Sequence, residues 1–211
     1  MKIGPLHTAQ VHVGTFDALL AGTGFAAVHH VDETLLARAQ TDGAGAVRQD
    51  ARYAVDLLRH CDALVCTCST LGPLIDEVGE PYILRIDRPA FDAALAFGPR
   101  VLMVICLDST RAPSEALLSD CAHRTGQPLH AETLLIDGAW PHFEAGDFTS
   151  FYEVIADQIR AACAATSFDA IVLAQASMAG AAQLLTDLDI PVLSTPQMAV
   201  DAAIETAQTR A

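Results

Sequence analysis

The 211-residue sequence has no long apolar run and few basic residues. Its longest uninterrupted apolar segment, Val101 to Leu107, is far shorter than the roughly 20 residues of a membrane-spanning helix. Only 12 Lys and Arg stand against 26 Asp and Glu, which gives a formal net charge of −14. This balance argues against nucleic acid or an anionic membrane as a partner. A small anionic substrate stays open, because backbone N–H groups and helix N-termini make locally positive pockets.

Motifs for common cofactors are absent or misplaced. The sequence has no P-loop, no HExxH, no G-x-S-x-G and no CxxC pair. The glycines of GTGFAA (22–27) precede a predicted strand instead of linking a strand to a helix, so they do not predict NAD binding. We therefore expect no cofactor. The first residues, interrupted by Pro5, His7 and His12, do not form a signal peptide pattern, and we expect a cytoplasmic protein.

No metal site is predicted either. In HHVDE (29–33), His29 and His30 would point to opposite faces of a strand. Asp32 and Glu33, at the end of that strand, are weak candidates for contacting a substrate amine or for acid–base work. The six cysteines are expected to be free thiols, because a large α/β chain without a signal is not a disulfide scaffold.

Short Val/Ile/Leu-rich segments alternate with amphipathic stretches along the whole chain. The predicted strands are 2–7, 25–31, 62–67, 82–86, 100–107, 129–135, 169–174 and 191–194. The clearest predicted helices are 46–60 and 148–165. This alternation predicts an α/β fold of mostly parallel sheets flanked by helices. In such folds, ligands bind at the carboxyl ends of the strands.

An internal repeat divides the chain into two similar halves. The segments that begin at Asp62 and at Asp169 share Asp-Ala, an apolar strand, a polar turn, a small-residue helix, a Pro-led strand and a helix. We therefore predict two α/β lobes related by a pseudo-twofold axis, 1–97 plus 190–211 and 98–189. The equivalent turns, 68–70 and 175–177, would then face each other across a cleft, each with a helix N-terminus suited to an anion.

Cys68 is the strongest candidate for a reactive group. It falls at a strand-to-helix turn, where the positive end of the helix dipole is expected to lower the pKa of a thiol. Core packing is the alternative for Cys68 and the favoured interpretation of Cys66, which lies inside the apolar run. A metal clip of Cys66 and Cys68 would lack further ligands at suitable spacing.

Hydroxyl and imidazole side chains follow several predicted strands. Ser69, Thr70, Ser177, Ser109 and Thr110 would either bind a substrate carboxylate or cap helices. His7 and Thr8 end the first strand, so His7 is placed to reach the same cleft. A buried, hydrogen-bonded histidine is the alternative.

These motifs together resemble the aspartate/glutamate/hydantoin racemase superfamily. The resemblance covers nearly the whole chain and rests on six segments: IGPLHT, DALVCTCSTLGP, PYILRID, VLMVICLDST, DAIVLAQASM and PVLSTP. It implies two similar α/β lobes with an active site between them, no cofactor and a small carboxylate-type substrate, and it is compatible with a homo-oligomer. In the family, one cysteine from each lobe acts on opposite faces of the substrate's α-carbon.

Only one of the two family cysteines has a counterpart here. The family's Cys-Asn-Thr turn matches 68–70, so the resemblance makes Cys68 the key thiol. The second turn, Gly-Cys-Thr, falls on 174–176, where Gln175 replaces the cysteine and is followed by Ala176 and Ser177. A threonine-containing turn of the second lobe falls near 109–110. The first-strand acid of the family falls near 7–8, and it too is absent.

The missing thiol leaves several functions open. Glutamine cannot exchange a proton near neutral pH, although it can hydrogen-bond a carboxylate. The first hypothesis is a cofactor-independent, isomerase-like enzyme that acts at the carbon next to a carboxylate or carbonyl, with Cys68 as its one thiol. Cys68 would protonate an enolate, add covalently to a substrate as in a cis–trans isomerisation, or act as a base opposite an acid such as His7 or Asp32. A one-cysteine decarboxylase and a hydrolase with Cys68 as nucleophile and His7 as base are alternatives. A small-acid binding or sensing protein without catalysis is the remaining hypothesis.

Overall fold

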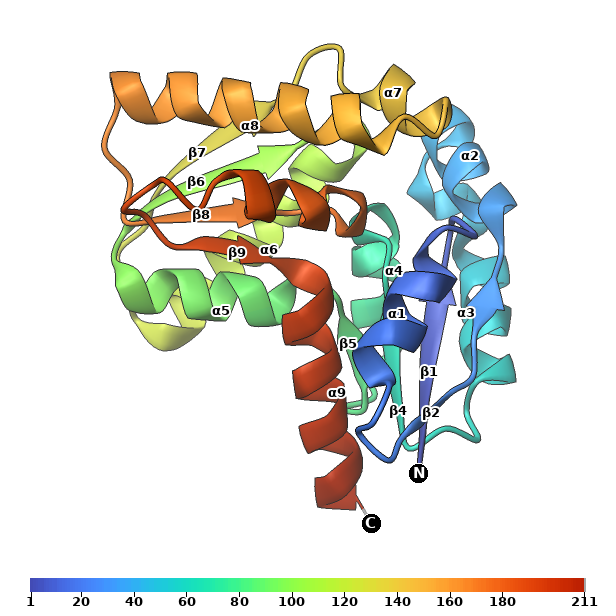
Figure 1. Cartoon of the computed structure of the whole chain (residues 1–211). Helices are drawn as coiled ribbons and strands as arrows, with labels where there is room; N and C mark the ends of the chain where they lie inside the picture. Colours follow the sequence, from blue (N-terminus) through green and yellow to red (C-terminus); the bar gives the residue numbers. More distant parts are fainter. Residues whose placement is uncertain (211) are drawn as a thin grey trace. The chain divides into compact units, whose positions relative to one another are not determined.

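The computed structural model describes residues 1–210 and has the predicted α/β architecture, with two wholly parallel sheets flanked by helices (Figure 1). The strands are β1 (Lys2–His7), β2 (Ala26–Ala27), β3 (His30–Val31), β4 (Ala63–Cys66), β5 (Ile83–Arg85), β6 (Arg100–Ile105), β7 (His130–Leu135), β8 (Ala170–Leu173) and β9 (Val192–Ser194). The α-helices are α1 (His12–Leu20), α2 (Glu33–Asp42), α3 (Arg48–Leu57), α4 (Gly72–Asp76), α5 (Arg88–Phe97), α6 (Arg111–Thr125), α7 (Trp140–Glu144), α8 (Phe148–Ala165) and α9 (Thr195–Arg210). Short 3₁₀ segments are η1 (Ala44–Val47), η2 (Ser69–Leu71), η3 (Asp108–Thr110) and η4 (Ala176–Leu184).

By its contacts the chain separates into two compact units. The first holds Met1–Ile86 together with the C-terminal residues from Pro196 onward, and the second holds Asp87–Thr195. Helix α5 and strand β9 therefore make their contacts within the second unit. The division into lobes at 97/98 and 189/190 stays a prediction.

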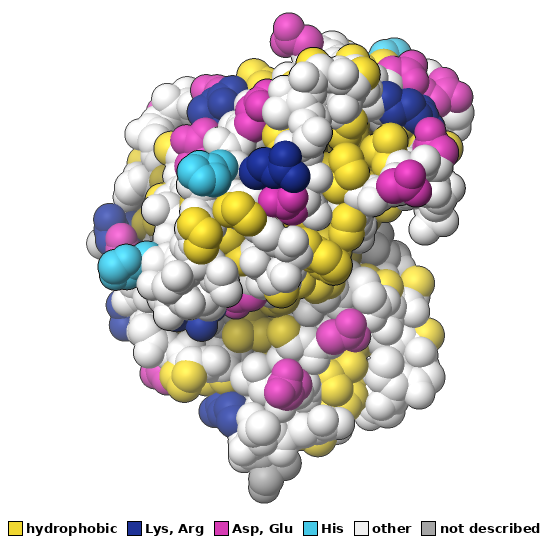
Figure 2. Space-filling view, turned by 90° about the vertical axis from the view of Figure 1, so that its left-hand side faces the viewer, with side chains coloured by type: hydrophobic (Ala, Val, Ile, Leu, Met, Phe, Trp, Pro, Cys, Tyr) yellow, Lys and Arg dark blue, Asp and Glu magenta, His cyan; other side chains and the backbone are white. Residues whose placement is uncertain are grey.

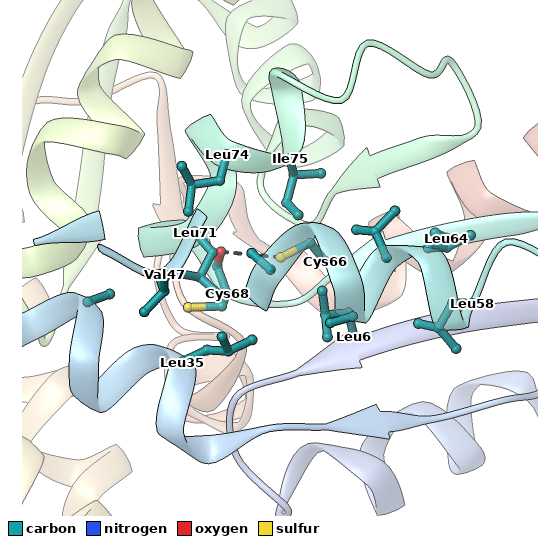
Figure 3. Packing of buried hydrophobic residues seen from close by; sticks show 14 of the residues in the cluster. Leu6, Leu35, Val47, Leu58, Leu64, Cys66, Cys68, Leu71, Leu74 and Ile75 are labelled. Atoms are coloured by element: carbon teal, nitrogen blue, oxygen red, sulfur yellow. Dashed lines mark hydrogen bonds between the residues drawn. The ribbon is translucent and has the colours of Figure 1, made fainter. Parts of the chain in front are cut away.

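The first unit is built on a sheet of order β2-β1-β4-β5, with β3 also pairing β1. Helix α3 packs on this sheet because its apolar residues recur at helical spacing, with Ala51, Ala54, Val55 and Leu58 all buried. Figure 3 shows this core, where side chains from β1 and β4 meet those of α2, η1 and η2. The opposite side of β1 is covered by α1, whose Phe16 lies edge-on to the ring of His7.

The second unit is built on a sheet of order β7-β6-β8-β9. Helix α8 lies over one face of this sheet and α5 over the other (Figure 1). Helix α8 begins as predicted at Phe148, where the Asp147 carboxylate accepts a hydrogen bond from the Ser150 N–H at 3.1 Å. Its buried residues, Phe151, Ile155 and Ile159, recur every four positions and face β6 and β8.

The repeated aspartates fix the same strand pair in both units. Asp62 Oδ2 accepts a hydrogen bond from the Lys2 N–H at 2.6 Å, and Asp169 Oδ2 accepts one from the Arg100 N–H at 2.9 Å. The Asp62 N–H returns a bond to the Lys2 carbonyl, as the Asp169 N–H does to the Arg100 carbonyl. Ile3 then pairs with Ala63, and Val101 pairs with Ala170. Each repeat thus begins with one residue that sets the register of two parallel strands.

The predicted strand over 25–31 is the main departure from the expected elements. It consists of two separate pairs, 26–27 and 30–31, each hydrogen-bonded to β1. The Val28 N–H still donates to the Ile3 carbonyl of β1 at 2.9 Å. The ladder is interrupted after it, where the His29 ring turns toward His7. The prediction of a continuous strand at this edge is therefore wrong. The interruption allows the His29 ring to bond His7.

No helix within residues 1–210 is long and apolar enough to cross a membrane. On the face shown in Figure 2, acidic side chains are interspersed with basic ones, histidines and uncharged surface.

Candidate functional site

Both units present the same pair of positions at the carboxyl end of their central strands. Thr8 and Cys68 are each the fifth residue after the paired Ile3 and Ala63. In the second unit, the fifth residues after Val101 and Ala170 are Cys106 and Gln175. The structure thus assigns Thr8 to Cys106 and Cys68 to Gln175 as equivalent positions. The second of these equivalences is the one that the repeat predicts.

The Cys68 sulfur lies among four hydrogen-bond donors of its own unit. They are the hydroxyls of Thr8 and Thr70 and the backbone N–H groups of Thr70 and Leu71. Cys68 is 7% exposed and Thr8 is 8% exposed. Figure 3 shows the sulfur pointing toward Leu35 and Val47, on the side of the sheet that α2 and η1 cover. The structure therefore brings Cys68, Thr8 and Thr70 together within the first unit.

The predicted lowering of the Cys68 pKa is wrong. Burial raises the pKa of the Cys68 thiol above its ordinary value, and the hydrogen bonds from Thr8, Leu71 and Thr70 oppose that rise without reversing it. The helix dipole is weak here, because the residues after Cys68 form a short 3₁₀ turn and then a five-residue helix. Near neutral pH the resting thiol is protonated, and the four donors would stabilise the thiolate that remains after it gives up its proton.

Cys66 supports the turn that carries Cys68. Its buried thiol donates a hydrogen bond to the Cys68 carbonyl oxygen at 3.6 Å, and the Leu71 N–H donates to the same oxygen at 3.1 Å. Cys66 also packs in the apolar cluster of β1, β4 and α3. The interpretation of Cys66 as a packing residue agrees with this environment.

His7 lies elsewhere. Its ring hydrogen-bonds Thr67 through Nδ1 at 3.0 Å and His29 through Nε2 at 2.9 Å. Because successive side chains of a strand point to opposite faces, His7 is on the α1 side of the sheet, whereas Thr8 is on the Cys68 side. The expectation of a buried, hydrogen-bonded histidine describes this ring. The structure does not bring it beside Cys68.

Asp32 and Glu33 have roles at the start of α2. Asp32 caps the helix by accepting bonds from the Thr34 N–H at 3.0 Å and the Thr34 hydroxyl at 2.6 Å. Glu33 accepts a bond from the Gln10 N–H at 3.0 Å. Both carboxylates therefore hold the backbone of the first unit.

Gln175 is tied to the neighbouring strand. Its Oε1 accepts hydrogen bonds from the N–H groups of both Cys106 and Leu107, the latter at 3.1 Å. An amide held in this way directs its NH₂ group, a pure donor, away from those two N–H groups. Gln175 can therefore offer hydrogen bonds to an acceptor such as a carboxylate, but it cannot transfer a proton.

The remaining predicted residues follow the same strand ends. Ser69 and Thr70 belong to η2, directly after Cys68, and Ala176 and Ser177 begin η4, directly after Gln175. Ser109 and Thr110 belong to η3, after β6. All except Ser109 are buried. Their roles in binding a substrate stay predictions.

Sequence reasoning overlooked Cys106. This buried thiol directly follows β6, within the apolar segment 101–107, and burial raises its pKa to about 12. The sequence does carry a signal for it. When the repeat is extended to include the preceding strands, 2–7 and 100–105, Cys106 takes the place that Thr8 has beside Cys68, and so lies beside Gln175. The repeat is most evident from Asp62 and Asp169 onward, and Cys106 lies before Asp169, directly after β6.

Replacing Gln175 by alanine is expected to destabilise the protein by about 1–3 kcal/mol, because two backbone N–H groups lose their acceptor. Chemical unfolding measures this loss, and faster amide exchange at Cys106 and Leu107 would locate it. Gln158→Ala is the matched control, because its amide bonds the N–H and the carbonyl of exposed Asp137, which water can bond instead, and its effect should stay below about 0.5 kcal/mol. Equal losses in the two variants would contradict the role assigned to Gln175.

Comparison with known proteins identifies the fold. No family model matches the sequence, and no curated protein matches it. Among solved structures, the chain is similar to aspartate racemase from Picrophilus torridus, with a TM-score of 0.69 and 16% identity over 98% of this chain and 94% of that one. Allantoin racemase from Pseudomonas fluorescens gives a TM-score of 0.67 and 19% identity, covering 99% and 92% of the two chains.

A third similar structure is a variant of arylmalonate decarboxylase, with a TM-score of 0.53 and 15% identity over all of this chain and 95% of that one. The chain therefore has the fold shared by the aspartate, glutamate and allantoin racemases, as the sequence motifs predict. The same fold occurs in a decarboxylase.

Proposed function

We propose that this chain is a cofactor-independent enzyme that acts at the carbon α to a carboxylate or carbonyl group of a small acid, with Cys68 as its proton-transferring thiol. The observation that carries the proposal is the environment of the Cys68 sulfur. A protonated thiol lies within reach of two hydroxyls and two backbone N–H groups, all of which favour the thiolate. Such a group is suited to donate a proton and to bear the resulting negative charge.

Proton donation to a planar enolate is the step that this environment favours. In a decarboxylation, the bond from the α-carbon to a carboxylate breaks, carbon dioxide leaves, and the bonding electrons remain as an enolate. The Cys68 S–H then gives its proton to the α-carbon, and water reprotonates the thiolate. In an isomerisation, the α-proton must first be removed, which requires a base or an ionised Cys68.

The second unit favours one-thiol chemistry. Its equivalent turn carries Gln175, which has no ionisable group, and Cys106 occupies the neighbouring position with a pKa raised by burial. A decarboxylase is therefore the second candidate function. The fold likeness to an arylmalonate decarboxylase is consistent with it. Hydrolysis with His7 as base receives no support, because the His7 ring bonds Thr67 and His29.

A substrate panel in deuterated water tests the proposal. Malonates, amino acids, hydantoins and maleate are incubated with the enzyme and followed by NMR, with Cys68→Ala as the control. We expect at least one compound to gain deuterium at its α-carbon in a manner that depends on Cys68.

The products separate the candidate functions. Loss of carbon dioxide with one deuterium incorporated identifies a decarboxylase, whereas exchange with inversion and no net loss identifies an isomerase. Calorimetric binding of a panel acid without any turnover would replace the proposal by a binding or sensing protein.

A further inference from the structure

A chain of hydrogen bonds connects the protein surface to the residue before Cys68. Asp17 Oδ1 lies 3.0 Å from His29 Nε2, and His29 Nδ1 lies 2.9 Å from His7 Nε2. His7 Nδ1 lies 3.0 Å from the Thr67 hydroxyl, which in turn lies 3.0 Å from the Leu6 carbonyl oxygen. The chain runs from a carboxylate that is 61% exposed to an imidazole and a hydroxyl that are both buried.

The positions of the hydrogens along these hydrogen bonds depend on whether the two histidine rings are neutral or one of them is protonated. The Asp17 carboxylate only accepts, so His29 Nε2 carries a hydrogen. If both rings are neutral, His29 Nδ1 is an acceptor and His7 Nε2 must donate to it. His7 Nδ1 is then an acceptor as well, and the single hydrogen of the Thr67 hydroxyl points to it.

One added proton reverses the direction in which hydrogens are donated between His29, His7 and Thr67. If His29 carries hydrogens on both nitrogens, its Nδ1–H donates to His7 Nε2. A neutral His7 must then hold its hydrogen on Nδ1 and donate it to the Thr67 oxygen. The Thr67 hydroxyl hydrogen is released from His7 and bonds the Leu6 carbonyl, which also accepts the Thr67 N–H at 3.0 Å.

We propose that Asp17, His29, His7 and Thr67 form a two-state relay, in which protonation of His29 switches the tautomer of the buried, uncharged His7 and turns the Thr67 hydroxyl from His7 to the Leu6 carbonyl. The relay gives His7 a positioning role. It does not depend on the chemistry proposed for Cys68.

The surroundings favour placing the proton on His29. The His29 side chain is 16% exposed and faces the Asp17 carboxylate, whereas His7 is fully buried. Burial, with smaller contributions from His12 and His29, lowers the pKa of His7 to about 3, so this ring stays neutral in ordinary buffers. His12, the other titratable group that faces His7 from α1, also has its pKa lowered by burial, to about 4.

The acidic groups near the ends of β1 and β3 have other partners. Asp32 bonds Thr34, and Glu33 bonds the Gln10 N–H. Asp17 is therefore the carboxylate that the hydrogen-bond chain offers to His29. Thr67 directly precedes Cys68. The relay therefore connects the protonation of His29, which pairs with Asp17, to the hydrogen bonds of the residue next to the thiol.

Histidine ¹⁵N chemical shifts of the full-length protein test the relay between about pH 5 and 8. We expect His7 to hold its hydrogen on Nε2 at the upper end and on Nδ1 at the lower end, without passing through an imidazolium. Exposed His60, which contacts the Leu57 carbonyl and lies outside the relay, serves as an internal reference for the ¹⁵N shifts.

Two variants locate the origin of the switch. Asp17→Asn removes the carboxylate that holds a hydrogen on His29 Nε2, so the pH dependence of the His7 tautomer should differ from that of the unaltered protein. His29→Gln removes the titrating ring, so the His7 tautomer should no longer change with pH. The proposal is overturned if His7 in the unaltered protein becomes an imidazolium in this range, keeps one tautomer throughout, or still switches in folded His29→Gln protein.

Discussion

Replacing Cys68 by alanine is expected to lower the rate of α-proton exchange or turnover by about a thousandfold, the usual scale for losing a group that transfers a proton. The reason is local, since four donors surround this sulfur and no other side chain of the turn can give up a proton near neutral pH. The measurement is the initial rate on the best compound of the substrate panel. Cys68→Ser should show a similar loss, because a hydroxyl holds its proton more tightly than a thiol.

Cys61→Ala is the matched control for this loss. Cys61 is a buried cysteine at the opposite end of β4, and its removal should change the rate by less than about threefold. The alkylation rate of Cys68 should continue to rise above the ordinary thiol pKa of about 8.5, because burial raises its pKa. A folded Cys68→Ala protein with near-normal rates would remove Cys68 from the mechanism.

Gly98→Ala is expected to destabilise the protein by about 3 kcal/mol, the largest loss among its glycines at positive φ. Gly98 has a φ of 153°, and a Cβ there would lie 2.5 Å from Asp169 Oδ2 and 2.8 Å from Asp169 Cβ. Asp169 cannot yield easily, because its carboxylate accepts bonds from the Arg100 N–H and from Arg100 Nη2 at 2.7 Å. The alanine therefore meets both an unfavourable backbone angle and a fixed side chain.

Two further glycines separate these two causes. Gly126 has a φ of 67° and open space around a Cβ, so Gly126→Ala should cost only the backbone term of about 1 kcal/mol. Gly14 lies in α1 with open space and no positive φ, so Gly14→Ala should stabilise the protein by about 0.5 kcal/mol. Urea unfolding of the three variants gives the comparison. Equal losses for Gly98→Ala and Gly126→Ala would show that contact with Asp169 is unimportant.

Much of the fold follows from local patterns in the sequence. The continuous apolar runs 101–105 and 170–173 are buried parallel strands, and the helix predicted over 148–165 has those bounds in the structure. The predicted helix over 46–60 begins as a 3₁₀ turn and continues as α3 to Leu57. The edge at 25–31 differs, because its pairing depends on where His29 turns, and no property of the local sequence encodes that contact.

The only part of the candidate site that the sequence predicts is the part contained in the internal repeat. The repeat pairs Cys68 with Gln175, and strand register supports that pairing in both units. The protonation state of Cys68 could not be read from the sequence, because it depends on burial by α2 and η1 against the donors around the sulfur. The partners of His7 were equally hidden, since Asp17 and His29 come from separate segments and meet only in the folded unit.

The bonds that Asp62 makes to Lys2 and Asp169 makes to Arg100 join the same two strands within each unit. From either aspartate, the chain reaches its chemically variable turn after the same number of residues and in the same strand register. Segments 62–71 and 169–178 thus occupy equivalent positions in their sheets. Because the register is set by the aspartate, a change of the residue six positions later alters the chemistry of the turn without altering how the two strands pair.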